Sequence, residues 1–155
     1  MARPGRWVLA AAVLALVAGA ALAQSRTIAD RPTVTVYKTP TGGCCTKWVV
    51  HLQAHGFEVV ARDVDEAALL EMKAGSRVPR ALESCHTAVV GTYVVEGHVP
   101  ASDIDRLLEE RPAVVGIGVP GMPIGSPGME MGDRREPYAV YTFDRDGKTE
   151  VFARH

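Results

Sequence analysis

The stretch "YKTPTGGCCTKWVVHL", residues 37–52, joins a predicted strand to a predicted helix. Residues 33–37 are β-branched or aromatic and favour a strand, which the following proline ends. Beyond the two glycines, apolar side chains follow the i, i+3, i+4, i+7 spacing of one helix face, at Cys45, Trp48, Val49 and Leu52. A helix over 44–55 is therefore predicted, and it opens on two adjacent cysteines, Cys44 and Cys45.

Further strands and helices follow in the order of a thioredoxin-like sheet. They are strands at 57–61, 87–90 and 93–96 and helices at 66–73 and 101–110. Asp65 is the expected N-cap of the first of these helices, and Ser102 or Asp103 that of the second. Strands joined through helices favour parallel pairing, whereas the strands on either side of Gly91 favour a hairpin. We predict an α/β fold: a thioredoxin-like sheet with flanking helices.

The C-terminal part departs from this pattern. The segment "GIGVPGMPIGSPGMEMGD", residues 116–133, is rich in Gly, Pro and Met, and neither a helix nor a regular strand is predicted there. Methionine is apolar and seeks contacts, so we interpret this segment as a packed loop and not as a linker. The following "YAVYTFDRDGKTEVF" alternates around an Asp-Gly turn and predicts a β-hairpin that closes the domain or extends the sheet edge.

The N-terminus has the pattern of a secretory signal peptide. Arg3 and Arg6 precede an apolar run at 7–17 that is short for a membrane span, and residues 21–23 form a small-x-small cleavage site. An uncleaved anchor is the alternative. An alanine-rich signal is typical of bacteria, so we expect export to the periplasm with cleavage after Ala23 and no later membrane span. The expected organisation is a signal peptide at 1–23, a polar leader at 24–32 and a single metal-binding domain at 33–155.

Charge and cysteine content narrow the function further. The net charge is −1 and no basic run occurs, so nucleic acid is not an expected partner. The chain has three cysteines. In an oxidising compartment an odd number leaves at least one thiol outside any intramolecular disulfide, where it is open to oxidation unless something occupies it.

Cys44 and Cys45 are poorly suited to bond to each other. Adjacent Cα atoms lie ~3.8 Å apart, whereas disulfides usually need about 4.4–6.8 Å. The start of a helix favours a thiolate, and thiolates bind soft metals. The alternative is that one cysteine packs in the core while the other forms a disulfide with Cys85.

Cys85 and His86 precede a predicted strand that, in a thioredoxin-like sheet, lies beside the start of the first helix. Three thiolates and an imidazole would suit Cu(I) or Zn. Thioethers from Met122 and Met129, each after a Pro-Gly pair, favour Cu(I) over Zn, although either Met could simply cap the core. His98 could join the site or cap a loop.

Three motifs together resemble one family. They are "YKTPTGGCCTKWVVHL", "VPRALESCHTAVVGTYVVEGHVPASDI" and "VPGMPIGSPGME". In this order they resemble the CopG-type copper-resistance proteins, once classed as a domain of unknown function, over residues 34–152. The resemblance implies a thioredoxin-like fold, periplasmic export, Cu(I) bound by cysteines with Met or His support, and a role in copper tolerance beside copper efflux systems. The family loop usually reads Cys-Gly-Cys-Cys, and its first cysteine falls at Gly42 here.

We therefore expect a Cu(I)-binding protein of copper tolerance, which is more a metal-binding protein than an enzyme. The expected metal ligands are Cys44, Cys45, Cys85, His86, Met122 and Met129. Copper, as one ion or more, is the expected cofactor, and copper efflux or chaperone proteins of the periplasm are the expected partners. One alternative is a thiol–disulfide oxidoreductase that uses Cys45 and Cys85, although Gly42 removes the C-x-x-C pair. Another is a small structural domain with a Cys45–Cys85 bridge.

Overall fold

The computed structural model describes residues 31–155. Pro32–His155 form one compact unit built on a single mixed sheet. The expected signal peptide at 1–23 and most of the expected leader at 24–32 lie outside the described residues. Within residues 31–155, no helix is long and apolar enough to cross a membrane.

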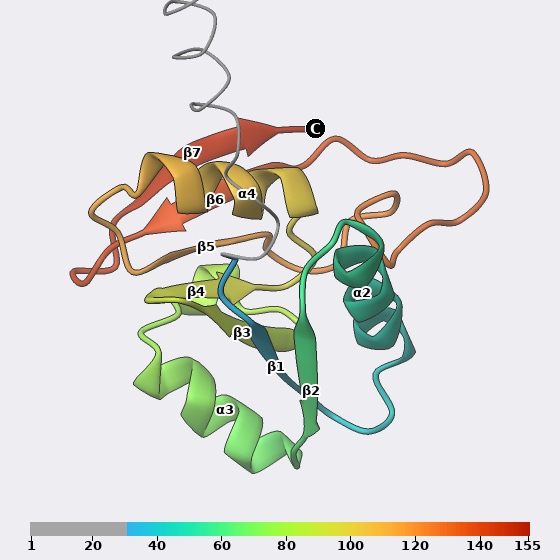
Figure 1. Ribbon diagram of the computed structural model, residues 1–155, viewed down its shortest axis with the longest axis horizontal. Helices are drawn as coiled ribbons and strands as arrows, with labels where there is room; N and C mark the ends of the chain where they lie inside the picture. Colours follow the sequence, from blue (N-terminus) through green and yellow to red (C-terminus); the bar gives the residue numbers. More distant parts are fainter. Residues whose placement is uncertain (1–30) are drawn as a thin grey trace, which may run out of the picture. The chain divides into compact units, whose positions relative to one another are not determined.

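The sheet has seven strands in the order β2-β1-β3-β4-β5-β6-β7 (Figure 1). The strands are β1 (Val34–Lys38), β2 (Val59–Asp63), β3 (His86–Val90), β4 (Tyr93–Glu96), β5 (Gly116–Gly118), β6 (Ala139–Phe143) and β7 (Thr149–Arg154). The helices are α2 (Gly43–Ala54), α3 (Glu66–Gly75), the short 3-10 helix η2 (Arg80–Leu82) and α4 (Ala101–Glu110). As expected, β1 pairs parallel with β2, and β3 and β4 form an antiparallel hairpin. The α/β class is confirmed, and the order β2-β1-β3-β4 agrees with a thioredoxin-like arrangement.

The helices cover opposite faces of the sheet. Buried side chains of α2 and α4, such as Trp48 and Ile104, share one core cluster with β1, β3 and β4. Successive strand residues point to opposite faces. On the other face, Lys73 of α3 reaches Thr87 and Glu96. The strip of sheet between these helices is therefore buried on both faces, which explains its apolar run in the sequence.

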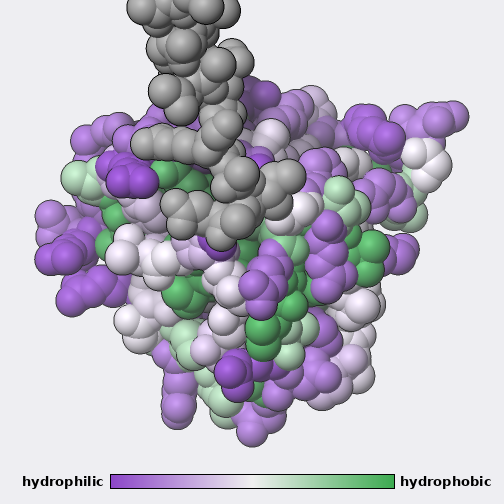
Figure 2. Space-filling view, viewed as in Figure 1, coloured by the Kyte–Doolittle hydropathy of each residue, from purple (hydrophilic) through white to green (hydrophobic). Residues whose placement is uncertain are grey.

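The sheet edge formed by β2 is open to solvent. Most β2 side chains are exposed, including Val60, and Val50 on the outer face of α2 is exposed as well. On the side of the molecule seen in Figure 2, polar residues cover most of the surface and apolar residues form separated areas. β2 has only five residues and ends on Arg62 and Asp63, and a short edge strand with charged side chains is a poor template for edge-to-edge pairing.

Two expected elements differ from the structure. β2 begins at Val59 and not at 57, because the Phe57 N–H still donates to the Leu52 carbonyl of α2 at 3.1 Å. The prediction that 116–133 contains no strand is wrong, since β5 pairs with β4 and β6 at the start of this segment. Gly116 makes that pairing possible: a Cβ there would lie 2.0 Å from the Val94 carbonyl oxygen.

The C-terminal hairpin is confirmed and extends the sheet through β6 and β7. The Asp144 carboxylate accepts hydrogen bonds from the backbone N–H groups of Asp146 and Lys148, and Gly147 takes a positive φ of 78°. Asp65 caps α3 as expected by accepting from the Ala68 N–H.

The expected side-chain cap of α4 is absent. Pro100 occupies the N-cap position and makes no side-chain cap hydrogen bond. The side chain of Asp103 instead points to the C-terminal residue, with its Oδ2 2.7 Å from His155 Nε2. Asp103 thus ties the end of the chain to α4, which the local sequence pattern does not reveal.

A buried ion pair links α3 to the β3–β4 hairpin. The Glu96 carboxylate is fully buried and accepts from Lys73 Nζ at 2.5 Å, from Thr87 Oγ1 at 2.7 Å and from the Ser84 N–H at 2.6 Å. Burial raises the pKa of Glu96, and the Lys73 charge and these hydrogen bonds oppose the rise. Since Ser84 directly precedes Cys85, this carboxylate also fixes the backbone beside a candidate ligand.

We predict that Glu96→Leu lowers the free energy of unfolding by ~3–5 kcal/mol, because it leaves the Lys73 ammonium buried without a counter-charge. The measurement is urea denaturation followed by circular dichroism. Adding Lys73→Met to the same chain should restore much of the loss, since an apolar pair of similar volume often replaces a buried ion pair without cost. As a control, Glu150→Leu breaks the exposed pair with Lys148 and should change the unfolding free energy little. A small effect of the single Glu96 variant would contradict the prediction.

Candidate metal centre

The three cysteines meet at the start of α2 because of how β1 and β3 pair. β1 ends at Lys38, shortly before α2 begins, and Lys38 is paired with His86 at the start of β3. The residue before β3, Cys85, is therefore placed beside the first turn of α2, which carries Cys44 and Cys45.

The sulfur atoms form a compact triangle. Cys44 Sγ lies 3.9 Å from both Cys45 Sγ and Cys85 Sγ, and Cys45 Sγ lies 3.1 Å from Cys85 Sγ. All three cysteines are free. Cys45 is fully buried, whereas Cys44 and Cys85 are partly exposed. The sequence-based expectation that these thiols come together is thus matched by the geometry, and their role as ligands stays a prediction.

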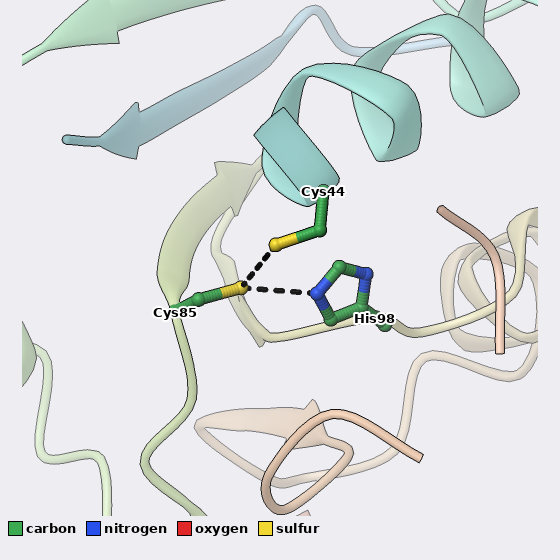
Figure 3. Close-up of side chains that lie close together, drawn as sticks. All are labelled: Cys44, Cys85 and His98. Carbon is green, nitrogen blue, oxygen red and sulfur yellow. Dashed lines mark hydrogen bonds between the residues drawn. The ribbon is translucent and has the colours of Figure 1, made fainter. Parts of the chain in front are cut away.

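Two imidazoles complete the cluster. His98 Nε2 lies 3.0 Å from Cys85 Sγ, and His86 Nδ1 lies 3.3 Å from the same sulfur. In Figure 3, Cys44, Cys85 and His98 point toward one another from the start of α2, the residue before β3 and the loop after β4. Two overlapping donor groups result, Cys44–Cys85–His98 and Cys45–Cys85–His86, each with its ligand atoms within 4.8 Å of one another.

His98 is oriented as a ligand. Its Nδ1 lies 2.8 Å from the Pro127 carbonyl oxygen. Because a carbonyl only accepts, Nδ1 carries the proton, and the lone pair of Nε2 is directed at Cys85 Sγ. A backbone carbonyl on the far ring nitrogen is the usual way in which a metal-binding histidine is held.

His98 was not among the expected ligands, although the register of the β3–β4 hairpin indicates its position beside Cys85. Thr87 is paired with Glu96, so each residue further out along β3 meets the next one beyond β4. The Gly97 N–H indeed donates to the His86 carbonyl at 3.0 Å. Continuing by one residue brings Cys85 beside His98.

His86 has a different environment. It is fully buried, its ring lies 4.3 Å from the Trp48 ring between centroids, and its Nε2 has no hydrogen-bond partner among the described residues. Burial holds the pKa of His86 well below its usual range, so the ring is neutral. Coordination through Nδ1 would move the ring proton to the unpartnered Nε2, which makes His86 the less well supported histidine ligand.

The surroundings of Cys44 and Cys85 favour the protonated thiol in the absence of metal. The hydrogen bond from Cys45, together with burial, raises the pKa of Cys85 to about 12. Burial and the neighbouring Cys85 raise the pKa of Cys44. For His98, burial lowers the pKa, but its interactions with Cys85, the Pro127 carbonyl and Glu130 together leave the pKa raised. A metal that binds here must displace thiol protons.

The Met-containing loop, residues 119–138 between β5 and β6, lies against the start of α2. Met122 Sδ is 3.9 Å from Cys44 Sγ. Met129 is half-buried, and no sulfur–sulfur contact joins it to the cysteines among the described residues. The loop is tied down by Ser84 Oγ, which donates to the Gly121 carbonyl at 2.5 Å. The structure therefore brings one of the two expected methionines, Met122, to the thiols.

Gly128 allows the loop to approach α2. Its φ is +87°, and a Cβ there would lie 2.7 Å from the Cys44 carbonyl oxygen and 2.9 Å from the Trp48 backbone nitrogen. Gly42 also borders the site, since a Cβ there would lie 3.1 Å from Cys45 Sγ.

His51 and His55 stand apart from this cluster. Their rings lie 4.3 Å apart between centroids, but His51 Nε2 accepts the Ala101 N–H at the start of α4. His51 therefore has a structural role in joining α2 to α4.

The chain is similar to known proteins over the part that carries the candidate site. Residues 82–129 match a family described as "Protein of unknown function, DUF411". Two solved structures are similar: "Copper resistance protein copG- Form 2", with 44% identity over 81% of this chain and 99% of that one, and "Copper resistance protein copG- Form 1", with 43% identity over 81% and 98%. Both have a TM-score of 0.75. A comparison with curated proteins gives no match.

The fold and the site define a mixed α/β protein with a thiol–imidazole cluster at the start of a helix. By its similarity to the two solved structures, the chain belongs to the family of the CopG copper resistance proteins.

We predict that Gly128→Ala exposes Cys44, because a methyl group at this position forces the loop away from α2. Anaerobic labelling by a thiol reagent should modify Cys44 faster than in the parent. Gly132→Ala is the matched control: it also has a positive φ, +60°, but nothing lies within 4 Å of its Cβ. The left-handed backbone costs about 1–2 kcal/mol in both variants, so the difference between them reports the contact. Equal labelling rates in the two variants would contradict the prediction.

Proposed function

We propose that this protein binds Cu(I) in the periplasm as part of copper tolerance. One observation carries the proposal: three cysteine sulfurs from two distant segments lie within 3.9 Å of one another. Three thiols this close together can bind one soft cation once it displaces their protons, and the resulting thiolates select Cu(I) or Zn. The family name of the two similar structures favours copper.

The proposed ligands are the thiolates of Cys44, Cys45 and Cys85 with His98 as the supporting imidazole. Met122 supplies a neutral thioether, which suits Cu(I) and is a poor ligand for Zn. His86, which is fully buried, and Met129 remain additional candidate ligands. His98 is preferred to His86 because the Pro127 carbonyl orients its ring, and Met122 is preferred to Met129 because its sulfur contacts Cys44.

Cys85 belongs to both donor groups. A thiolate can bridge two metal ions, so we propose a site for one or more Cu(I) ions with Cys85 at its centre. The proposed role is to bind and pass on copper, with copper efflux or chaperone proteins of the periplasm as partners, as the family resemblance implies. Export through the signal peptide at residues 1–23 is part of the same proposal.

A thiol–disulfide oxidoreductase is the second candidate, and the 3.1 Å separation of Cys45 Sγ and Cys85 Sγ favours it. Two observations weigh against it. Cys45 is fully buried, so a substrate disulfide cannot reach it, and the pKa of Cys85 is raised to about 12, which disfavours an attacking thiolate. Both observations suit a metal site, because the metal itself displaces the protons.

We predict that Cys44→Ser combined with Cys85→Ser weakens Cu(I) binding by more than roughly 100-fold, because losing a ligand's supporting partner alone costs about 10–100-fold. The measurement is an anaerobic competition titration against a chromophoric Cu(I) chelator, with protein purified after periplasmic expression of the full chain. Met72→Leu is the control, since it removes a sulfur of α3 that accepts a hydrogen bond from Ser76 Oγ and lies outside the thiol–imidazole cluster. Unchanged affinity in the double variant would refute the proposed site.

We predict that Gly42→Cys raises the affinity for Cu(I) or the number of ions bound. A Cβ at this position lies 3.1 Å from Cys45 Sγ, so a new sulfur would stand beside the existing three after a small adjustment. Gly43→Cys is the matched control, because nothing lies within 4 Å of its Cβ and its thiol would be added outside the cluster. Native mass spectrometry after copper loading counts the ions. If both variants behave like the parent, a fourth thiol at Gly42 is not a donor.

A further inference from the structure

We propose that Met122 is the exchange ligand of the site, the side chain that first takes up Cu(I) from outside and last releases it, and that it hands the ion to Cys44. The inference rests on the proposed Cu(I) function and adds a direction to it. In this proposal Met122 sets the rate at which Cu(I) enters and leaves the site, and contributes little to the binding affinity.

Exposure to solvent decreases from Met122, through Cys44, to the buried proposed ligands. Met122 is 49% exposed, while Cys45, His86 and His98 are all 0% exposed. Cys44 lies between these extremes, and its sulfur is 3.9 Å from Met122 Sδ. An incoming ion therefore meets the thioether before it reaches the buried donors.

As the ion moves inward, it can bind the next sulfur before it leaves the previous one. Metal–sulfur bonds are about 2.3 Å long for a metal such as zinc, so two sulfurs 3.9 Å apart can hold one ion between them. An ion held by Met122 and Cys44 can gain Cys85 before it loses Met122, since Cys85 Sγ is also 3.9 Å from Cys44 Sγ. The copper remains Cu(I), no electron is transferred, and each thiol that binds releases its proton to water.

The chemistry of a thioether fits this role. It is neutral, loses no proton on binding and cannot form a disulfide, so it stays ready at an exposed position where a thiol would be oxidised. A single weak neutral donor adds little to the affinity set by three thiolates, but it lowers the barrier to entering and leaving the site.

The backbone holds Met122 in place while its side chain stays exposed. The preceding residue, Gly121, accepts a hydrogen bond at 2.5 Å from Ser84 Oγ, and Ser84 itself directly precedes Cys85. Met131 provides the contrast on the same loop: it is 51% exposed, but no sulfur contact joins it to the cysteines among the described residues. Exposure alone therefore does not single out Met122; its fixed position over Cys44 does.

The test measures Cu(I) transfer between the full-length protein, purified from the periplasm, and a chromophoric chelator by anaerobic stopped-flow absorbance, in both directions. Met122→Ala should slow transfer by about tenfold each way, the change expected from one weak bond lost in the rate-limiting step. The dissociation constant should stay within about threefold of the parent value, because both rates fall together. Met131→Ala should leave rates and affinity unchanged.

Met122→Leu separates the sulfur from the apolar cover, because leucine keeps the bulk and lacks the thioether. It should be as slow as Met122→Ala, and parent-like transfer in Met122→Leu would overturn the inference. Parent-like transfer in Met122→Ala, or a fall in affinity without a fall in the uptake rate, would also overturn it. If the parent itself binds no Cu(I), the proposed function fails, and this outcome is distinct from a parent that binds copper and exchanges it independently of Met122.

Discussion

The Glu96 carboxylate is the interaction on which the position of the site depends. It is fully buried and is compensated by the Lys73 ammonium, the Thr87 hydroxyl and the Ser84 N–H. A buried charge is tolerated only when its partners are held in good geometry. These contacts require that α3, the β3–β4 hairpin and Ser84 fold together. They fix the backbone next to Cys85 and so hold its sulfur in a position that a loop alone would not define. Ser84 extends this constraint through its hydroxyl to Gly121 and the Met-containing loop.

Strand register supplies the second constraint. β3 lies between β1 and β4, so its first residues face the end of β1 on one side and the residues after β4 on the other. One side provides α2 with its two cysteines, and the other provides His98. Cys85 thus receives donors from both neighbours because of its place in the sheet. The same logic explains why Cys85 is common to both donor groups.

Local sequence patterns predicted the elements whose stability is local, and missed those that depend on tertiary contacts. The apolar spacing around Trp48 and the Asp-Gly turn each specify a structure by themselves. β5 does not: its two glycines carry no strand preference, and it exists because Gly116 can lie against Val94. The role of Asp103 depends on His155, which is far away in the sequence. The candidate thiols could be found from element order alone, whereas choosing His98 over His86 requires the Pro127 carbonyl, and distinguishing Met122 from Met129 requires the conformation of the loop.

The proposed donors divide into a buried group that suits retention and an exposed group that suits exchange. His98 links the two, because its Nδ1–H is held by Pro127 of the same loop that carries Met122. Its Nε2 can face a metal only while that loop stays packed on α2, which Gly128 permits. The orientation of His98, a buried proposed ligand, and the position of Met122, an exposed one, are therefore set by one segment. A change that loosens the loop should disturb the imidazole and the thioether together, even though neither residue has been replaced. In this chain Gly42 adds no fourth thiol, so we expect the proposed site to depend more heavily on this loop than a four-cysteine site would.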